Sequence, residues 1–262
     1  MIRGILAGDG SIGFRKWLSA LLDLLYPPHC VVCGCLGAWL CADCRESVQV
    51  LRPPICRHCG KPLDRPGICL SCERRRSYLS GIRSVAPHLP PLREAIHALK
   101  YEGVRVLARP LGEILAGYWR LEPLPVRAIV PVPLHRTRLR QRGYNQSLLL
   151  ARELAERIDL PLCEGALLRE RNTPSQVGLS VEERWTNVWG AFRCSNSDLR
   201  GEHVLLVDDV LTTGATLEAC ASTLLEAGVE EVWALTLTRA VDSPAVATGV
   251  RCRPWSGGDP QH

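Results

Sequence analysis

Val204-Leu-Leu-Val-Asp208-Asp209-Val-Leu-Thr212-Thr213-Gly214-Ala215-Thr216 is the stretch that decides the fold, because four parts follow one another in it in a fixed order. Its apolar, β-branched start predicts a buried parallel strand. Two carboxylates stand where this strand is expected to end. A loop of small and hydroxyl-bearing residues follows, and the periodicity of residues 217–227 predicts a helix that stops at Gly228. The stretch therefore predicts the strand, loop and helix of an α/β fold, with an acid pair at the junction.

The loop has the composition of a phosphate-binding site. Backbone N–H groups at the start of a helix, together with threonine hydroxyls, suit a phosphate, and Gly214 lets the backbone approach the anion closely. The adjacent acids would repel that phosphate, so they suit vicinal hydroxyls, a hydrated Mg²⁺ or both. Phosphate at one end and hydroxyls at the other describe a ribose 5-phosphate. The stretch resembles the phosphoribosyl pyrophosphate (PRPP) loop of type I phosphoribosyltransferases.

Length and composition limit the class of protein. The chain has 262 residues, 46% of them apolar, and a formal net charge of +5, so it can bury a sizeable core and is mildly basic. No apolar run reaches the roughly 18 residues that a transmembrane segment needs, and no secretory signal is evident. Residues 1–27 carry apolar side chains at helical spacing, which predicts an amphipathic N-terminal helix. Packing of this helix on the protein is favoured over attachment to a membrane surface.

Cysteines are concentrated in residues 28–76. Nine of the 13 cysteines lie there, and eight of them form four C-x-x-C pairs, the spacing that lets two thiolates face one metal ion. Without a secretory signal, zinc is favoured over disulfides. We expect a double zinc-ribbon region with two structural Zn²⁺ ions, since four cysteines leave no open coordination position. The expected ligands are Cys30, Cys33, Cys41 and Cys44 for the first ion and Cys56, Cys59, Cys69 and Cys72 for the second.

Spacing leaves the pairing of these cysteines open. A cross-braced arrangement, in which the pairs interleave between the two ions, fits the same spacing. Cys35 is expected to be spare. His29 and His58 stand beside ligands, and a solvent-facing role is favoured for both.

Residues 77–240 alternate between strand and helix patterns. Strands are predicted from Gly81 to His88, at 127–133, near Leu167, Phe192 and Val204, and at 232–237; helices are predicted at 91–101, 107–118 and 148–158. This order predicts a parallel sheet with flanking helices, the type I phosphoribosyltransferase fold, preceded by the small zinc-binding region. Residues 241–262 have no periodicity and are expected to be disordered.

A basic segment follows the strand predicted at 127–133. Residues 123–152 contain no acid and six arginines, and arginine forks match phosphate oxygens. At the carboxyl edge of the sheet, this segment would face the acid pair across a crevice and bind pyrophosphate or a DNA backbone. A solvated basic loop is the alternative. The candidate contacts are Arg138, Arg140, Arg142 and Asn145, with Arg169 and Arg171 from a later segment.

Residues 168–190 form that later segment, which mixes turn residues, arginines and amides. A helix start follows, with Ser180 as its expected cap and Glu183 three residues later. A mobile lid that excludes water from a charged site has this composition. Ordinary surface loops have this composition equally often, so composition alone does not decide between a lid and a surface loop.

Several motifs together resemble the ComF (competence protein F) family, from about residue 22 to residue 238. In chain order they are Leu24–Cys30 with the cysteine pairs, His97–Tyr101, Pro131–Arg136, Arg142–Gln146, Arg171–Gln176 and residues 204–216. The resemblance implies a zinc-ribbon region followed by a type I phosphoribosyltransferase domain. It implies that Asp208 and Asp209 are catalytic residues that hold the ribose hydroxyls and Mg²⁺. It also implies that PRPP is bound by Thr212, Thr213, Gly214, Ala215 and Thr216 at the 5-phosphate and by Pro133, Leu134, His135 and Arg136 at the pyrophosphate.

The same resemblance implies a role in natural competence, in which incoming single-stranded DNA is handled on the cytoplasmic side of the membrane. The chain would then be cytoplasmic or peripheral at the inner membrane. Its partners would be PRPP, single-stranded DNA and the DNA-import machinery.

Two function classes are open. The first is a phosphoribosyltransferase of nucleotide metabolism, whose acceptor the sequence does not identify. The second is a nucleic-acid-binding protein whose arginines follow a DNA backbone. The intact acid pair favours PRPP, and a basic segment longer than a pyrophosphate needs favours DNA. Aromatic residues are only 5% of the chain, and Trp185, Trp189 and Tyr144 are those near the basic segments, so a base-stacking platform would be thin.

Overall fold

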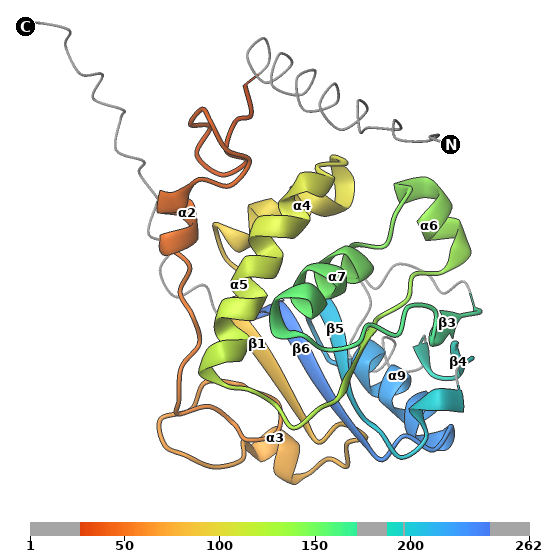
Figure 1. Ribbon diagram of the computed structural model, residues 1–262. Helices are drawn as coiled ribbons and strands as arrows, with labels where there is room; N and C mark the ends of the chain where they lie inside the picture. The colour runs from red at the N-terminus through yellow and green to blue at the C-terminus, as the bar shows by residue number, and fades with distance from the viewer. Residues whose placement is uncertain (1–26, 172–187, 196, 242–262) are drawn as a thin grey trace, which may run out of the picture.

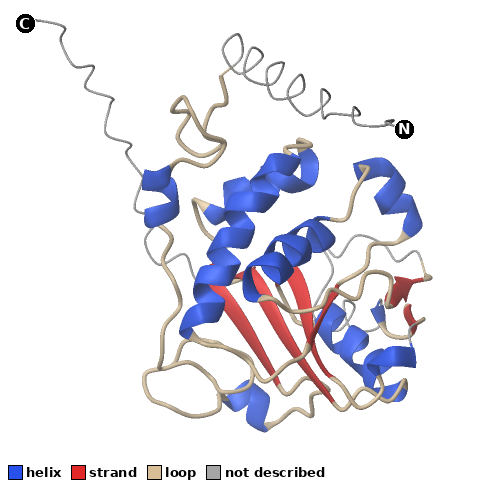
Figure 2. Ribbon diagram, in the orientation of Figure 1, coloured by secondary structure: helices blue, strands red, loops and turns tan. Residues whose placement is uncertain are grey.

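The computed structural model describes residues 27–171, 188–195 and 197–241. Its centre is a four-stranded parallel sheet in the order β1-β6-β5-β2, which lies between two layers of helices (Figures 1 and 2). The strands are β1 (Gly81–Pro87), β2 (Ala128–Pro131), β5 (His203–Leu211) and β6 (Glu231–Arg239). The predicted parallel sheet with flanking helices is confirmed.

The central strand β5 forms because its first half is apolar and branched, which suits a strand buried on both faces. Residues 204–207 are fully buried, and β5 pairs with β6 on one side and β2 on the other. The strand continues through the acid pair to Leu211, and Asp208 lies in register with Thr236 of β6. The prediction that the strand ends at the acids is wrong, because pairing with β6 carries it two residues past Asp209.

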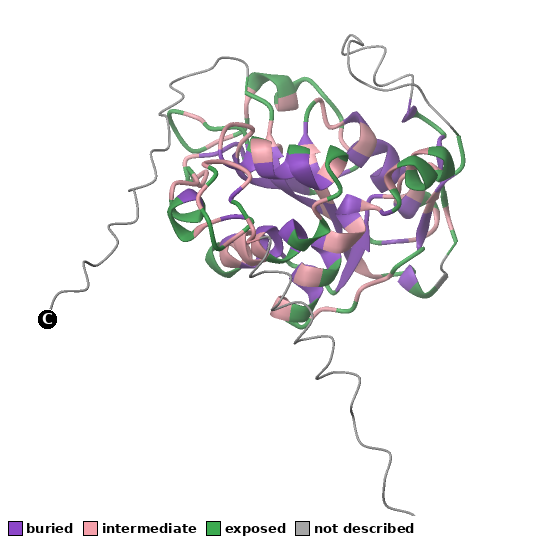
Figure 3. Cartoon of the chain, turned by 90° about the horizontal axis from the view of Figure 1, so that it is seen from above, coloured by how far each residue is buried: buried purple, intermediate pink, exposed green. Residues whose placement is uncertain are grey.

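Helices cover both faces of the sheet because alternate strand residues point to opposite faces. On one face Leu205 and Val207 pack with α4 (Leu92–Tyr101), α5 (Ala108–Leu121) and α7 (Gln146–Ile158). On the other, Val204 and Leu206 pack with α9 (Ala215–Glu226). Figure 3 shows the buried sheet between helices whose outer sides are exposed. Three short helices lie in connections: η1 (Arg105–Leu107), α6 (Arg136–Arg142) and η2 (Ser197–Leu199).

Two short strands lie outside the main sheet. The strands β3 (Leu167–Arg169) and β4 (Phe192–Cys194) pair with each other in an antiparallel sheet of their own. Their predicted place in the parallel sheet is wrong. They meet each other directly, and their apolar residues Leu167 and Phe192 extend the core on the α9 side of the main sheet.

The cysteine-rich segment docks on the sheet and its helices at two places. The first ribbon contains α2 (Ala42–Glu46) and joins α5 through an ion pair, Arg45 Nη1 to Glu113 Oε2 at 2.9 Å. The second ribbon contains α3 (Leu70–Glu73) and lies at the start of β1 (Figure 1). There the backbone N–H of Ile82 donates to the carbonyl of His58 at 2.6 Å.

Some predicted features fall outside the described residues. They are most of the N-terminal helix (residues 1–26), residues 172–187 of the candidate lid with its expected cap, and the tail from residue 242 onward. Within the described ranges, no helix combines the length and the apolar composition needed to cross a membrane.

Candidate functional site

The phosphate loop, Thr212–Gly214, joins β5 to α9. Gly214 is the N-cap of α9 and has a φ of 81°, a left-handed conformation that glycine adopts at little cost. A Cβ at this position would make only ordinary contacts, the nearest with Leu211 Cδ1 at 3.7 Å, so the backbone conformation rather than lack of space requires glycine. The N-terminus of α9 therefore opens on the loop, as the sequence predicts for a phosphate cradle.

A cavity of about 440 Å³, the site cavity, lies beside the phosphate loop at the carboxyl ends of β2 and β5. Open α/β sheets bind ligands at this edge. The cavity brings together predicted residues from distant parts of the chain. Those on its wall are Pro133, Leu134, Arg138, Arg142, Arg169, Asp208, Asp209, Thr212, Gly214 and Thr216.

The acid pair is held by specific partners on the cavity wall. Asp208 Oδ1 accepts from Ser147 Oγ at 2.7 Å and from the backbone N–H of Asp209 at 2.9 Å. Asp209 Oδ1 forms an ion pair with Lys100 Nζ at 2.8 Å. Asp209 is 3% exposed, and its Oδ2 has no hydrogen-bond partner within the described structure. A buried carboxylate oxygen of this kind fits a cation or a ligand hydroxyl, so these residues suit Mg²⁺.

Burial sets the charge state of this wall. It raises the pKa of Asp208 to about 6, and the charge of Asp209 adds to the effect, against the opposing hydrogen bond from Ser147 and the charge of Lys100. Burial also disfavours the charged form of Lys100, but the Asp209 carboxylate outweighs it and the pKa of Lys100 is raised. Asp208 is therefore ionised at pH 8 and becomes protonated as the pH falls through about 6.

The cavity wall also contains polar residues that are absent from the predicted site, and they are His88, Lys100, Tyr101, Gln146 and Ser147. Lys100 and Tyr101 end α4, and His88 follows β1, so the fold brings them to the acid pair from far away in the chain. The sequence signal that points to Lys100 and Tyr101 is the motif His97–Tyr101 at the end of an amphipathic helix, and it does not identify their partners. Ser147 lies in the first turn of α7, where its hydroxyl reaches Asp208.

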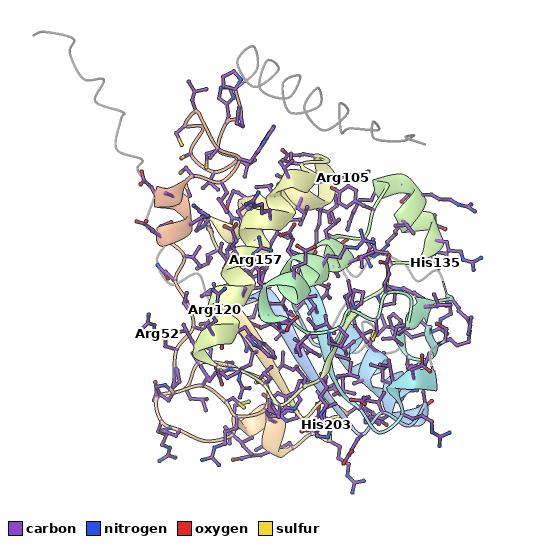
Figure 4. All side chains as sticks on the ribbon, in the orientation of Figure 1. Arg52, Arg105, Arg120, His135, Arg157 and His203 are labelled. Carbon is purple, nitrogen blue, oxygen red and sulfur yellow. The ribbon has the colours of Figure 1, made fainter. Side chains whose placement is uncertain are left out.

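Seven predicted residues do not line the site cavity: Thr213, Ala215, His135, Arg136, Arg140, Asn145 and Arg171. Two of them cap helices through their side chains, His135 at the start of α6 (Figure 4) and Asn145 at the start of α7. Arg136 and Arg140 are exposed on α6, and Arg171 donates to the carbonyl of Trp189 at 2.5 Å. Thr213 lines a second cavity behind the loop.

The basic segment folds as helix α6 rather than as a loop, and it ends at Gly143 with a φ of 80°. A stacking groove of about 440 Å³, lined in part by Lys100, Tyr101, Arg138 and Arg142, shares these four residues with the site cavity. The Arg142 guanidinium lies 5.4 Å from the centroid of the Tyr101 ring. The prediction that Trp185, Trp189 and Tyr144 are the aromatics near the basic segment is wrong in this respect, because α4 adds Tyr101, which is 66% exposed.

Tyr144 has a different role from Tyr101. It is buried, and Arg105 covers its ring at 4.5 Å from the centroid. Arg105 Nη2 also donates to the carbonyl of Gly143 at 3.4 Å. These contacts hold the end of α6 against the turn after α4, which fixes one side of the stacking groove.

The thiols of the second ribbon have the geometry of a zinc site. Cys56, Cys59, Cys69 and Cys72 lie with their sulfurs within 4.8 Å of one another, and the Cys59 and Cys69 sulfurs are 3.7 Å apart. Zinc–sulfur bonds of about 2.3 Å in a tetrahedron place two sulfurs about 3.8 Å apart, so the donor set fits Zn²⁺. The backbone N–H of Cys69 also points at Cys56 Sγ, at 3.3 Å.

The first ribbon shows the same spacing with one additional thiol. The sulfurs of Cys30 and Cys44 and those of Cys33 and Cys41 are 3.7 Å apart in each pair. The set whose sulfurs all lie within 4.8 Å of one another is Cys30, Cys33, Cys35 and Cys41, so Cys35, expected to be spare, takes the place predicted for Cys44 in this set. Each cluster takes its cysteines from one segment of the chain. Among the described residues the arrangement is therefore sequential, and the cross-braced alternative is wrong.

Comparison with known proteins gives the same two parts in the same order. Residues 21–73 match the model of the double zinc ribbon domain, and residues 145–247 match that of the phosphoribosyl transferase domain. Competence protein F of Haemophilus influenzae is 33% identical over 209 residues, which cover 77% of this chain and 90% of that protein. The chain belongs to the ComF family.

Other relatives of this ComF-family chain match over similar lengths. DNA utilization protein YhgH of Escherichia coli K12 is 32% identical over 231 residues, which cover 82% of the chain and 99% of that protein. Competence protein ComFC of Bacillus subtilis is 29% identical over 196 residues, which cover 72% and 79%. The resemblance stated from the sequence motifs is confirmed, together with the zinc-ribbon and phosphoribosyltransferase parts that it implies.

Proposed function

We propose that this ComF-family chain binds PRPP together with Mg²⁺ in the site cavity. The observation that carries the proposal is the buried Asp209 Oδ2, which has no partner in the described structure and belongs to a residue on the wall of a cavity bordered by the phosphate loop. A ribose 5-phosphate offers hydroxyls at one end and a phosphate at the other. The hydroxyls match the acid pair, and the phosphate matches the phosphate loop.

The proposed contacts divide the ligand among three elements. Asp208 and Asp209 of β5 hold the ribose hydroxyls and Mg²⁺. The loop and first turn of α9, Thr212 to Thr216, take the 5-phosphate. Pro133 and Leu134, with Arg138 and Arg142 of α6, take the pyrophosphate.

Transfer of the ribosyl group would pass through a state in which C1 carries positive charge, so the contribution of the chain is electrostatic. The arginines of α6 stabilise the departing pyrophosphate, and the acid pair holds the ribose by its hydroxyls. Lys100 keeps Asp209 in place through their 2.8 Å ion pair. When bound, Mg²⁺ supplies positive charge to the pyrophosphate oxygens.

PRPP with Mg²⁺, at about 100 times its Kd, is expected to raise the Tm by about 5–10 °C. Binding to the native state alone adds about 2.7 kcal/mol at this excess, and 1 kcal/mol shifts the Tm of a chain this size by about 2–4 °C. Thermal unfolding of the zinc-loaded protein measures the shift. Ribose 5-phosphate and pyrophosphate, which each match one part of the site, are expected to give smaller shifts. An unchanged Tm with PRPP would rule the proposal out.

We also propose that single-stranded DNA binds in the stacking groove. Tyr101 presents an exposed ring there, with Arg142 over it and the His97 ring 5.0 Å away between centroids. Unpaired bases stack on such rings, and the arginines of α6 match the phosphates that link them. The groove shares part of its wall with the site cavity, so a strand in it would lie beside bound PRPP.

Tyr101→Ala is expected to weaken binding of an oligo-dT strand by about 5–150-fold, because a stacked base contributes about 1–3 kcal/mol. Tyr101→Phe keeps the ring and is expected to bind like the parent. Fluorescence anisotropy at fixed salt measures both. Duplex DNA is the second control, since its bases are not available for stacking. Equal affinity of the alanine variant and the parent would place the strand elsewhere.

The biological role that we propose is the handling of imported single-stranded DNA. Relatives named for competence and for DNA utilization support it. A place on the cytoplasmic side of the inner membrane, with the DNA-import machinery as partner, belongs to the same proposal.

A further inference from the structure

A second cavity, the rear cavity, has a volume of about 540 Å³ and lies behind the phosphate loop. One part of its wall is the loop itself, with Leu211 at its start, and another is the second ribbon, including Cys59 and Cys72. The loop thus borders a cavity on each side. Its position therefore depends on the strand ends that carry it.

The second ribbon is fixed to the edge of the sheet at β1. The N–H of Ile82 donates to the His58 carbonyl at 2.6 Å, and Arg83 Nη1 donates to the Arg57 carbonyl at 3.1 Å. Gly60 packs so closely that a Cβ there would lie 2.7 Å from the carbonyl oxygen of Ile82. Its φ of 68° also requires glycine. The zinc-binding turn and the sheet edge are thus in direct contact.

Arg239, the last residue of β6, connects this ribbon to the phosphate loop. Its Nη1 donates to the carbonyl of Cys59 at 2.7 Å. The next residue, Ala240, donates its N–H to the carbonyl of Leu211 at 2.7 Å, immediately before Thr212. Arg239 lines the rear cavity and does not line the site cavity. Its side chain therefore does not contact a ligand in the site cavity.

We propose that Arg239 is a positioning residue through which the zinc of the second ribbon sets the geometry of the phosphate loop. The proposal rests on PRPP binding in the site cavity. Zinc holds the Cys59 carbonyl in place, that carbonyl holds the Arg239 side chain, and the strand end that carries Arg239 holds Leu211. The two sites are then coupled: zinc in the second ribbon strengthens PRPP binding, and PRPP retains that zinc.

The first ribbon supplies the matched control. Its ion pair with the sheet's helices joins Arg45 to Glu113 of α5, and neither residue lines the site cavity or the rear cavity. Arg45→Met also removes an arginine contact between a ribbon and the rest of the fold, here an ion pair rather than a bond to a backbone carbonyl, but it has no route to the phosphate loop.

Calorimetric titration of PRPP with Mg²⁺ into zinc-loaded full-length protein tests the coupling. Arg239→Met is expected to weaken PRPP binding by roughly 5–30-fold, the usual range for residues that couple two sites. Arg45→Met is expected to bind like the parent. Zinc content is measured on every sample, and two ions per chain in Arg239→Met show that its ribbons are folded.

Zinc release to a chelator gives the reciprocal readout, which a purely structural role would not change. In the parent, PRPP with Mg²⁺ is expected to slow the release of one of the two zinc ions. In Arg239→Met it is expected to slow neither. Parent-like PRPP affinity in Arg239→Met, or release of both ions unaffected by PRPP in the parent, would overturn the coupling while leaving PRPP binding intact. No PRPP binding in the parent would instead overturn the proposed function on which the coupling rests.

Discussion

Replacing both Asp208 and Asp209 by Asn is expected to lower the affinity for PRPP with Mg²⁺ by at least about 100-fold. Each carboxylate offers a charged hydrogen bond or metal contact, and such contacts contribute about 1.5–3 kcal/mol each. The asparagine side chains keep the shape of the wall but lose both negative charges. Calorimetric titration of the variant beside the parent measures the loss.

The ion pair of Asp209 with Lys100 calls for a control. Asp209→Asn leaves the Lys100 ammonium buried without its counter-charge, which destabilises the fold by itself. The variant that combines Asp209→Asn with Lys100→Met removes that charge. Asp208→Asn alone keeps an oxygen that accepts from Ser147, so it tests the site with little cost to folding. Glu164→Gln, an exposed acid paired with Arg152, is the surface control. Unchanged PRPP affinity in Asp208→Asn and in the variant that replaces both aspartates would show that the acid pair does not bind PRPP.

Replacing Cys56 and Cys59 by Ser is expected to release about one zinc ion per chain and to unfold the second ribbon. Structural zinc in small ribbons contributes about 10–16 kcal/mol of apparent folding free energy. Between residues 54 and 73 the buried side chains are those of Ile55 and Cys56, so apolar packing alone does little to hold this segment folded. Metal analysis counts the zinc, and limited proteolysis detects the unfolded ribbon.

Cys163→Ser is the matched control, because Cys163 lies outside both thiol clusters. It is expected to retain two zinc ions and the proteolytic pattern of the parent. A Cys56/Cys59 variant that kept both ions, or a parent protein purified without zinc, would contradict the assignment of the clusters.

The local parts of the fold follow from the sequence because they depend on neighbours in the chain. Residues 204–228 contain their own strand, turn and helix signals, and the structure places β5, the phosphate loop and α9 there. The end of β5 does not follow, because its partner β6 extends it past the acid pair. The sequence also does not predict the pairing of β3 with β4, because a strand of three residues is too short for its pattern to indicate a partner.

The site likewise contains residues that the sequence predicts and residues that only the packing of distant elements brings to it. Asp208, Asp209 and Gly214 stand together in the sequence and are found together on the cavity wall. Lys100 and Tyr101 belong to a helix whose apolar face explains its periodicity, and only the packing of α4 brings its last turn to the acid pair. Conversely, His135 and Asn145 carry polar side chains in a basic segment, but both are used to cap helices.

The measurement that tests the central claim most directly is a calorimetric titration of PRPP into the zinc-loaded parent at pH 8, with and without Mg²⁺. Asp208 has a pKa of about 6, so at pH 8 it is ionised, and protons compete with the cation only as the pH falls through 6. We predict saturable binding at one site per chain that requires Mg²⁺ and weakens at pH 5. No binding heat at pH 8 in the presence of Mg²⁺, at PRPP concentrations up to the millimolar range, would contradict the account.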